Sequence, residues 1–249
     1  MLGEERHSAI LTIVNEQKSV TVQELMKFLG ISESTIRRDL NLLDREGLLI
    51  KVHGGAIANN SGYHTMDDDV AVRKGLNRDE KLEIARYAAG LIETGDMVYL
   101  DAGTTTELMI DFITQNDVTF VTNAFSHARR LSEKGLKTYI LGGEFKPVTE
   151  AIVGEEAILC LDKYNFTKGF WGTNGITVKN GFSTPDVKEA MIKRKSMQKT
   201  KDKYVLSDHT KFSQISPVSF ADFDSAGIIT YKIEDTAFKG YKNITEVEK

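Results

Sequence analysis

The sequence predicts a small winged helix-turn-helix domain followed by a larger α/β domain with a mainly parallel sheet. Within the first 58 residues, three segments with helical apolar periodicity precede a short strand–turn–strand pattern. From residue 79 onward, helical and strand-like segments alternate, which is typical of a parallel sheet with crossover helices. A polar stretch separates the two patterns. We therefore expect domains at 1–58 and 79–249, joined by a linker at 59–78.

Length and composition narrow the class of protein. A chain of 249 residues, 41% of them hydrophobic, can bury a substantial core. No apolar run approaches the roughly 20 residues that cross a bilayer, and no signal-peptide pattern opens the sequence. We expect a cytoplasmic protein with no membrane partner. The single cysteine, Cys160, cannot form an internal disulfide and is interpreted as a buried helix residue.

The first three helices follow from local signals. Apolar residues recur at helical spacing between 4 and 16, and Thr21 with Glu24 forms a capping box that opens a second helix. Gly30 ends that helix, and Ser32 caps a third helix that runs to about residue 46. Two helices joined by a short glycine turn indicate a helix-turn-helix.

The third helix has a polar face opposite its apolar stripe. Arginine pairs with guanine or phosphate and asparagine pairs with adenine, so these residue types suit a DNA major groove. Asp39 and Asp44 lie nearer the buried edge, where we expect them to orient the arginines. The polar face and its flanks contain Ser34, Thr35, Arg37, Arg38, Asn41 and Arg45.

A small hairpin, the wing, follows the third helix. Residues 48–52 are typical of a strand, and His53, Gly54 and Gly55 of a tight turn before 56–58. Two adjacent glycines allow backbone amides to approach phosphate, and Lys51 and His53 add donors. The net charge of −4 gives no support to nucleic-acid binding, and helix-turn-helix folds also serve in protein docking. Geometry alone leaves both functions open.

The linker contains an acidic triplet at 67–69. Three consecutive carboxylates project in different directions, so a solvated segment is favoured over a metal site. We expect no metal site and no cofactor. In the larger domain we expect helices at 82–92, from 105, at 124–131 and 185–199, and strands at 97–100, 118–121, 137–141, 168–171, 203–206 and 227–230.

Three successive strands of this domain end in polar turns. Residues 101–106 (DAGTTT) follow the first strand, Thr122 and Asn123 the second, and Gly142 and Gly143 the third. Ligands of parallel sheets bind at the carboxyl ends of strands, and a glycine turn before a helix favours an anion. Such turns also merely cap helices, but three in succession favour one pocket for phosphate. Further walls are expected from Asn174, Asp186, Glu189, Lys193 and Lys211.

The stretch from Lys188 to Lys203 is basic. It is interpreted as the solvated face of a helix, with Lys193 alone turned toward the pocket, rather than as a second DNA surface. Trp171 is interpreted as strand core rather than a base-stacking platform.

Sequence motifs in both domains resemble those of the DeoR family of transcriptional repressors. The resemblance is carried by STIRRDL at 34–40, HGGA at 53–56, LDAGTTT at 100–106 and GTNGI at 172–176. It implies operator DNA as a partner, a homodimer or homotetramer, and a sensor domain similar in fold to sugar-phosphate isomerases such as ribose-5-phosphate isomerase. The DNA-binding residues that we expect are Ser32, Ser34, Thr35, Arg37, Arg38, Asn41, Lys51, His53, Gly54 and Gly55.

The resemblance also implies a phosphorylated sugar as effector. MIDF at 109–112 and FA at 220–221 further resemble the fructose-operon branch of the family, which implies fructose 1-phosphate, whereas other branches respond to other sugar phosphates. At 208–211 the sequence DHTK departs from relatives at His209 and Thr210 but keeps Lys211. The resemblance assigns phosphate to Gly103, Thr104, Thr105 and Thr106, and the sugar to Asp101, Thr122, Asn123, Asn174, Asp186, Glu189 and Lys211.

Two other classes of function compete with a repressor. An active sugar-phosphate isomerase would use Asp186, Glu189, Lys193 and Lys211 for proton transfer from carbon, although the same residue types also bind polyols without chemistry. A signalling adaptor would use the N-terminal domain for protein docking. The length of the family signature favours a repressor without catalytic residues, which pairs so that two recognition helices occupy successive half-sites.

Overall fold

The computed structural model describes residues 3–17, 19–45, 48–58, 70–233 and 235–247. Its contacts divide the chain into two compact units, Met1–Met66 and Asp67–Lys249. The predicted linker at 59–69, with its acidic triplet, lies outside the described residues. Residues 70–75, also predicted as linker, form a short helix, α4 (Val70–Gly75).

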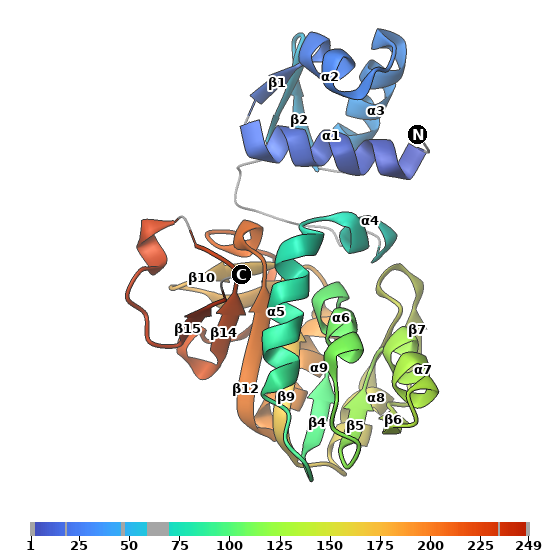
Figure 1. Ribbon diagram of the computed structural model, residues 1–249, viewed down its shortest axis with the longest axis vertical. Helices are drawn as coiled ribbons and strands as arrows, with labels where there is room; N and C mark the ends of the chain where they lie inside the picture. The colour runs from blue at the N-terminus through green and yellow to red at the C-terminus, as the bar shows by residue number, and fades with distance from the viewer. Residues whose placement is uncertain (1–2, 18, 46–47, 59–69, 234, 248–249) are drawn as a thin grey trace. The chain divides into compact units, whose positions relative to one another are not determined.

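The N-terminal unit combines three helices with a three-stranded antiparallel sheet (Figure 1). The sheet order is β1-β3-β2, so the predicted hairpin of β2 and β3 gains a third strand along β3. Sequence patterns missed β1 because it has three residues. The elements are α1 (Gly3–Gln17), β1 (Ser19–Thr21), α2 (Val22–Leu29), α3 (Glu33–Arg45), β2 (Leu49–Val52) and β3 (Gly55–Ala58).

The local signals that start and end α2 are confirmed. The Thr21 hydroxyl accepts from the Glu24 backbone N–H at 3.2 Å, and the Glu24 carboxylate accepts from the Thr21 N–H at 2.8 Å. Gly30 ends the helix in the left-handed region, with φ of 66°. Ile36, Leu40 and Leu43 of α3 are buried as predicted, so the opposite face of that helix is exposed.

The C-terminal unit is built around a seven-stranded sheet whose neighbouring strands all run parallel, in the order β15-β14-β12-β9-β4-β5-β6 (Figure 1). The predicted parallel sheet is confirmed. Its strands are β4 (Met97–Leu100), β5 (Thr119–Thr122), β6 (Lys137–Ile140), β9 (Phe166–Gly172), β12 (Thr200–Ser207), β14 (Gly227–Thr230) and β15 (Ile244–Glu246).

Two small antiparallel sheets accompany the main sheet, and the sequence patterns predicted neither. They consist of three- and four-residue strands without a clear alternation of apolar residues. One pairs β7 (Glu144–Lys146) with β8 (Ala151–Val153), and the other joins β10 (Gly175–Thr177), β11 (Gly181–Thr184) and β13 (Val218–Ala221).

Helices pack on both faces of the main sheet. Val98 and Leu100 of β4 pack with apolar residues of the helices on one face, while Tyr99 between them packs with those on the other. The first layer holds α5 (Arg78–Gly90), α6 (Thr104–Phe112) and α7 (Phe125–Glu133); the second holds α8 (Glu155–Leu161) and α9 (Val187–Gln198). Trp171 is fully buried, as predicted, and Cys160 lies half-buried in α8.

Candidate functional site

The order of the seven strands reverses direction between β4 and β9. The chain moves from β4 to β5 and β6 on one side, and β9, β12, β14 and β15 follow on the other. Asp101 follows β4, and Gly172 ends β9. The Gly172 N–H donates to the Asp101 carboxylate at 3.2 Å, so the two strand ends meet. Such a switch point at the carboxyl ends of strands is where ligands of open α/β sheets bind.

Asp101 and Lys193 form a buried ion pair at this point. Lys193 reaches from α9, and its ammonium also donates to the Gly172 carbonyl at 3.1 Å. Their side chains are 1% and 6% exposed. Burial raises the pKa of the Asp101 carboxyl, and the Lys193 ammonium opposes that shift. Both residues therefore lie at the predicted site, with their charges directed at each other.

The three threonines of the turn differ in what their hydroxyls do. Thr106 is fully buried, and its hydroxyl bonds the Asp101 and Gly103 carbonyls at 2.7 and 2.8 Å and lies 3.1 Å from the His127 ring. Within the described residues, Thr104 and Thr105 make no side-chain hydrogen bond. The hydroxyls of Thr104 and Thr105 are thus free for a ligand, whereas the Thr106 hydroxyl fixes the turn.

His127 supports that turn as a neutral residue. Burial lowers its pKa to about 4, so the ring carries no charge near neutral pH. Its second nitrogen lies 3.2 Å from the Ser126 hydroxyl. The sequence motifs did not single out His127.

Asn123 and Thr122 also hold the turn 101–106 in place. The Asn123 side-chain oxygen accepts from the Tyr99 hydroxyl at 3.1 Å and from the Ala102 N–H at 3.0 Å, while its amide donates to the Ile152 carbonyl at 3.3 Å. The Thr122 hydroxyl accepts from the Ala124 N–H at 3.0 Å. Both predicted residues are buried beside the turn and position it.

Further predicted residues cluster along the first turns of α9. Asp186 caps the helix by accepting from the Glu189 N–H at 2.9 Å. Glu189 accepts from the Thr149 hydroxyl at 2.5 Å and from the Lys146 ammonium at 3.0 Å. The negative charge of Glu189 acts on Asp101 and raises its pKa further. The Lys146 ammonium lies 3.3 Å from Asp186 and 3.0 Å from Glu189 and so brings these two carboxylates together.

The remaining predicted residues are Asn174 and the glycine pair Gly142 and Gly143. Asn174 is half-buried, and its side-chain oxygen accepts from the Thr184 hydroxyl at 3.2 Å. Gly143 has φ of 141°, and a Cβ there would lie 2.6 Å from the Val153 carbonyl oxygen. Close packing against β8 therefore explains this glycine. At Gly142 a Cβ would meet nothing within 4 Å.

A cationic cluster beside the end of β12 joins the predicted Lys211 to Lys81 and Arg73, which were not among the predicted site residues. Lys81 of α5 is 5% exposed, and burial lowers its pKa to about 8, with Asp208 opposing the shift and Lys211 and Arg73 adding to it. The buried Nε of Arg73 has no hydrogen-bond partner within the described residues. Lys81 lies at helical spacing from Ile84, Ala85 and Ala88, which form the buried stripe of α5. A lysine on an apolar stripe is unusual, and this pattern could have identified Lys81 from the sequence.

The predicted DNA-binding residues of α3 lie on its exposed side. Ser32, Ser34, Arg37, Arg38 and Asn41 are exposed, and Thr35 is half-buried. Within the described residues, Arg38 makes no hydrogen bond or ion pair, so its guanidinium is available. Arg37 pairs with Glu33 at 2.7 Å.

The expectation that Asp39 and Asp44 orient the arginines of α3 is wrong. Asp39 is buried and accepts from Arg6 at 2.5 Å and lies 3.0 Å from His7, both on α1. Asp44 accepts from the Lys51 backbone N–H at 2.8 Å. The physical reason is proximity: α1 crosses the buried edge of α3, so Asp39 ties two helices of the core together.

The wing residues separate into exposed and buried positions. Lys51, His53 and Gly54 are exposed, and the Lys51 ammonium donates to Asn41 at 2.7 Å. Gly54 has φ of 90°, which the turn requires. Gly55 is buried, and a Cβ there would lie 2.1 Å from the Val20 carbonyl oxygen. Packing of β3 against β1 therefore accounts for Gly55.

Comparison with known families decides the identity of both units. The model for the DeoR-like helix-turn-helix domain matches residues 6–62, and that for the DeoR C terminal sensor domain matches residues 76–232. The chain belongs to the DeoR family. As expected from the sequence, it carries the helix-turn-helix and sensor domains of that family.

Full-length relatives of this DeoR-family chain are regulators. It is 43% identical to the uncharacterized HTH-type transcriptional regulator FruR of Bacillus subtilis (strain 168), over 100% of this chain and 98% of the relative. It is 33% identical to the lactose phosphotransferase system repressor of Staphylococcus aureus (strain N315), over 93% and 92%. Among solved structures, ribose 5-phosphate isomerase A of Methanocaldococcus jannaschii covers 55% of each chain with 17% identity and a TM-score of 0.42.

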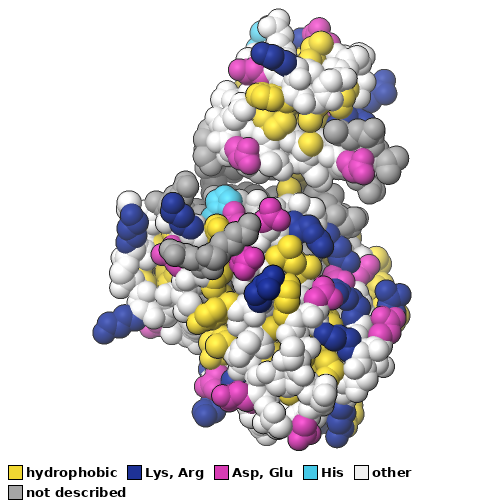
Figure 2. Space-filling view, in the orientation of Figure 1, with side chains coloured by type: hydrophobic (Ala, Val, Ile, Leu, Met, Phe, Trp, Pro, Cys, Tyr) yellow, Lys and Arg dark blue, Asp and Glu magenta, His cyan; other side chains and the backbone are white. Residues whose placement is uncertain are grey.

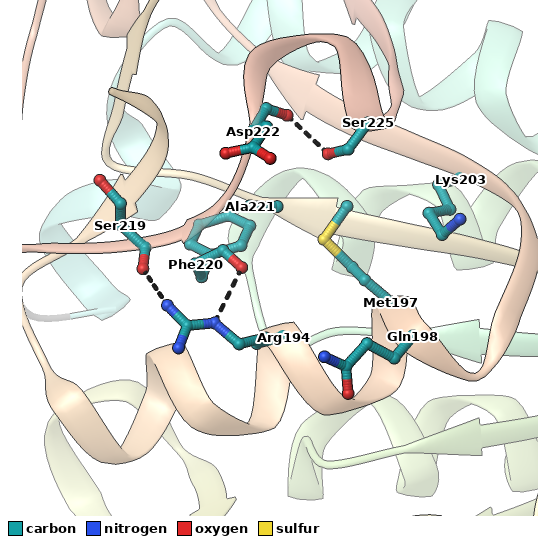
Figure 3. A pocket seen from close by; sticks show the side chains of 9 residues that line it. All are labelled: Arg194, Met197, Gln198, Lys203, Ser219, Phe220, Ala221, Asp222 and Ser225. Atoms are coloured by element: carbon teal, nitrogen blue, oxygen red, sulfur yellow. Dashed lines mark hydrogen bonds between the residues drawn. The ribbon is translucent and has the colours of Figure 1, made fainter. Parts of the chain in front are cut away.

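A separate surface pocket of the sensor domain lies away from the predicted residues (Figure 3). Arg194 of α9 extends across it and donates to the Ser219 and Phe220 carbonyls of β13 at 2.6 and 3.4 Å. None of the predicted effector residues lines it. Arg194, next to the buried Lys193, thus holds β13 against α9.

Charged side chains of both signs cover the sensor domain. Figure 2 shows acidic and basic side chains interspersed over the visible face of the sensor domain. Of the helices described, none is long and apolar enough to span a membrane. The described residues also contain no cluster of three or more His, Cys, Asp or Glu side chains suited to a metal ion.

Proposed function

We propose that the chain represses a sugar-utilisation operon and that a phosphorylated sugar, fructose 1-phosphate, releases it from operator DNA. The observation that carries the proposal is the grouping of Lys81, Arg73 and Lys211 at the same sheet edge as the free hydroxyls of Thr104 and Thr105. Three cations, two of which also act on the buried Asp208 carboxylate, and a helix N-terminus suit a phosphate dianion.

The sugar would lie against the more polar side of this edge. The side chains that would contact the sugar are those of Asn174, Asp186 and Glu189. The turn that carries the phosphate site is held in place by Asp101, Asn123 and Thr106. Carboxylates and amides are suited to hydroxyl groups of a sugar. The effector site therefore combines a cationic end with an uncharged or acidic end.

DNA binding is supported by the exposed face of α3. Arg38 has no partner within the described residues, and Asn41 and Lys51 lie beside each other at 2.7 Å. A single recognition helix makes few contacts, so we infer a homodimer or homotetramer that places helices in successive half-sites. A regulator of this kind acts where the DNA is, and a cytoplasmic location is part of the proposal.

The choice of fructose 1-phosphate rests on relatives. The identity to the Bacillus regulator named FruR is 43% over the full chain, against 33% to the lactose phosphotransferase system repressor. The higher of the two identities, to the relative named FruR, is what favours a fructose phosphate. The sugar must be identified by experiment.

The isomerase alternative receives little support from the geometry. Proton transfer from carbon needs a carboxylate free to reach the substrate. Of the two candidate carboxylates, Glu189 accepts from Thr149 and Lys146, and Asp186 caps α9 and lies 3.3 Å from the Lys146 ammonium. The relatives are also transcriptional regulators.

Thermal unfolding with a panel of sugar phosphates tests the proposal. A ligand that binds the native state raises its apparent stability, so fructose 1-phosphate should raise the melting temperature and free fructose should not. A rise with another sugar phosphate alone would keep the repressor and change its effector. No rise with any phosphate, or turnover of one, would refute the proposed sensor role.

A further inference from the structure

The short helix α4 is the first described element that follows the wing along the chain. It belongs to the C-terminal unit, whereas residues 1–66 form the N-terminal unit. Among the described elements of the sensor domain, α4 is therefore the one nearest in the chain to the DNA-binding domain. The contacts that hold α4 decide what a change in its position would depend on.

One contact ties α4 to the cationic cluster. The Lys81 ammonium donates to the carbonyl oxygen of Arg73, in α4, at 2.6 Å. Lys81 is buried, and this neutral carbonyl is the hydrogen-bond partner of its ammonium within the described residues, while the Asp208 and Glu80 carboxylates act on it through charge. A phosphate dianion near Lys81 would be a much stronger acceptor and would compete for the ammonium.

A second contact ties α4 to the helix behind the threonine turn. The Lys74 ammonium lies 3.0 Å from the Glu107 carboxylate. Glu107 is 10% exposed and belongs to the first turn of α6, where its N–H donates to the Gly103 carbonyl at 2.9 Å. A displacement of the turn at Gly103 therefore moves the carboxylate that Lys74 contacts.

Glu107 also contacts α7. Arg130 of α7 lies 3.4 Å from the Glu107 carboxylate, donates to its carbonyl at 3.1 Å and pairs with Asp111 at 2.6 Å. Because the Glu107 N–H donates to the Gly103 carbonyl, the ion pair with Lys74 links α4 to the turn. The two contacts therefore join α4 to two parts of the proposed effector site: Lys81 in the cationic cluster and Glu107 behind the threonine turn.

We propose that α4 couples the effector site to the DNA-binding domain and that Lys74 is the positioning residue of this coupling. The inference rests on the proposed function and names the regulation of that same site. Effector phosphate changes the partner of Lys81 and shifts the turn beneath Glu107. The position of α4 then differs between the free and the bound protein, and Lys74 transmits that difference without contacting the effector.

Variants of the full-length protein separate coupling from binding. Lys74→Ala removes the ion pair, Lys74→Arg keeps it, and Lys179→Ala removes an exposed lysine on the turn between β10 and β11. For each variant, calorimetry measures the affinity for the sugar phosphate that stabilises the unmodified protein. Fluorescence anisotropy measures operator affinity with and without that sugar phosphate.

In the unmodified protein and in Lys179→Ala, we expect the effector to lower operator affinity by about 5- to 150-fold. In Lys74→Ala this ratio should fall toward unity while effector affinity stays close to normal, and Lys74→Arg should restore it. A Lys74→Ala protein with the full ratio would overturn the inference. So would a loss of effector binding itself, because Lys74 would then be a binding residue.

Hydrogen exchange of the α4 amides gives a readout that does not need DNA. Their exchange rate should change on addition of the effector in the unmodified protein and much less in Lys74→Ala. An unmodified protein that releases DNA with unchanged α4 exchange would refute the coupling role and leave the repressor standing. An unmodified protein that binds no sugar phosphate would refute the proposed function and, with it, the coupling.

Discussion

Asp101, at the carboxyl end of β4, and Lys193, in the middle of α9, form an ion pair that is almost fully buried. The pair joins the point where the strand order reverses to the helix layer on the far face of the sheet. Because the Lys193 ammonium neutralises the Asp101 carboxylate, the positive charge of Lys193 is not free for a phosphate. The cationic side chains that remain for an anion are those around Lys81.

This pair predicts a large effect on stability. Lys193→Met leaves the buried Asp101 carboxylate without its cation and with only the Gly172 N–H as a donor, and breaking a buried ion pair typically costs about 3–5 kcal/mol of unfolding free energy. Urea unfolding followed by fluorescence of the buried Trp171 measures this loss. Lys195→Ala, which removes an exposed pair with Asp162 at 2.6 Å, serves as the control and should have little effect. Equal losses in both variants would contradict the assignment.

Lys81 predicts a pH dependence of effector binding. Burial lowers the pKa of Lys81 to about 8, so its ammonium is lost as the pH rises through that value. Phosphate favours the ammonium form, and effector affinity should therefore fall above about pH 8 with proton uptake on binding. Calorimetry in buffers of different ionisation enthalpy measures both quantities.

The lowered pKa of Lys81 also determines whether the free energy of unfolding rises or falls with pH. An unfolded lysine titrates near its ordinary value of 10.5, so between about 8 and 10.5 the unfolded state binds more protons. The free energy of unfolding should rise with pH across that window. Lys81→Arg stays charged and should remove the pH dependence of binding above about pH 8. A dependence that persists in this variant would exclude Lys81 as its source.

The threonine turn predicts different roles for neighbouring hydroxyls. Thr105→Val should weaken effector binding by about 1.5–3 kcal/mol, the range for a hydrogen bond to a charged group, with little change in stability. Thr106→Val removes the hydroxyl that holds the Asp101 and Gly103 carbonyls and should lower the melting temperature. Calorimetry and thermal unfolding of both variants distinguish them. The reverse pattern would contradict the division.

The exposed face of α3 predicts a selective loss of DNA binding. Arg38→Ala should weaken operator binding by about 1–3 kcal/mol while leaving the effector-induced rise in melting temperature unchanged. Anisotropy with a labelled operator measures the loss. Arg129→Ala, an exposed arginine of α7, is the matched control. Loss of both activities in a folded Arg38→Ala protein would show that the two domains do not divide the work as proposed.

Much of the fold could be predicted because it depends on local signals. The capping box at Thr21 and Glu24, the left-handed glycine at Gly30 and the strand at 97–100 all appear where the sequence pattern places them. Strand β1 and the strands of the two small antiparallel sheets were not predicted, since segments of three or four residues carry little periodicity; the wing was predicted with the help of its glycine turn. Gly55 shows a related limit: its closeness to Val20 depends on β1, which has no signal in the sequence.

The candidate site was predicted in part for a similar reason. Strand ends identify which residues lie at one edge of the sheet, and Asp101, Gly172 and Lys193 do meet there. Sequence spacing does not show which hydroxyls and charges are already used within the fold. It therefore treats Thr105 and Thr106 alike, although the hydroxyl of one is free and that of the other is fully bonded.

The central claim is that a sugar phosphate in the sensor domain weakens operator binding. The most direct test is one operator-binding isotherm measured by anisotropy with and without saturating fructose 1-phosphate, at constant salt. The account predicts that operator affinity falls by about 5- to 150-fold in the presence of the effector, and that free fructose has no effect. Identical isotherms with a sugar phosphate that demonstrably binds the protein would contradict it.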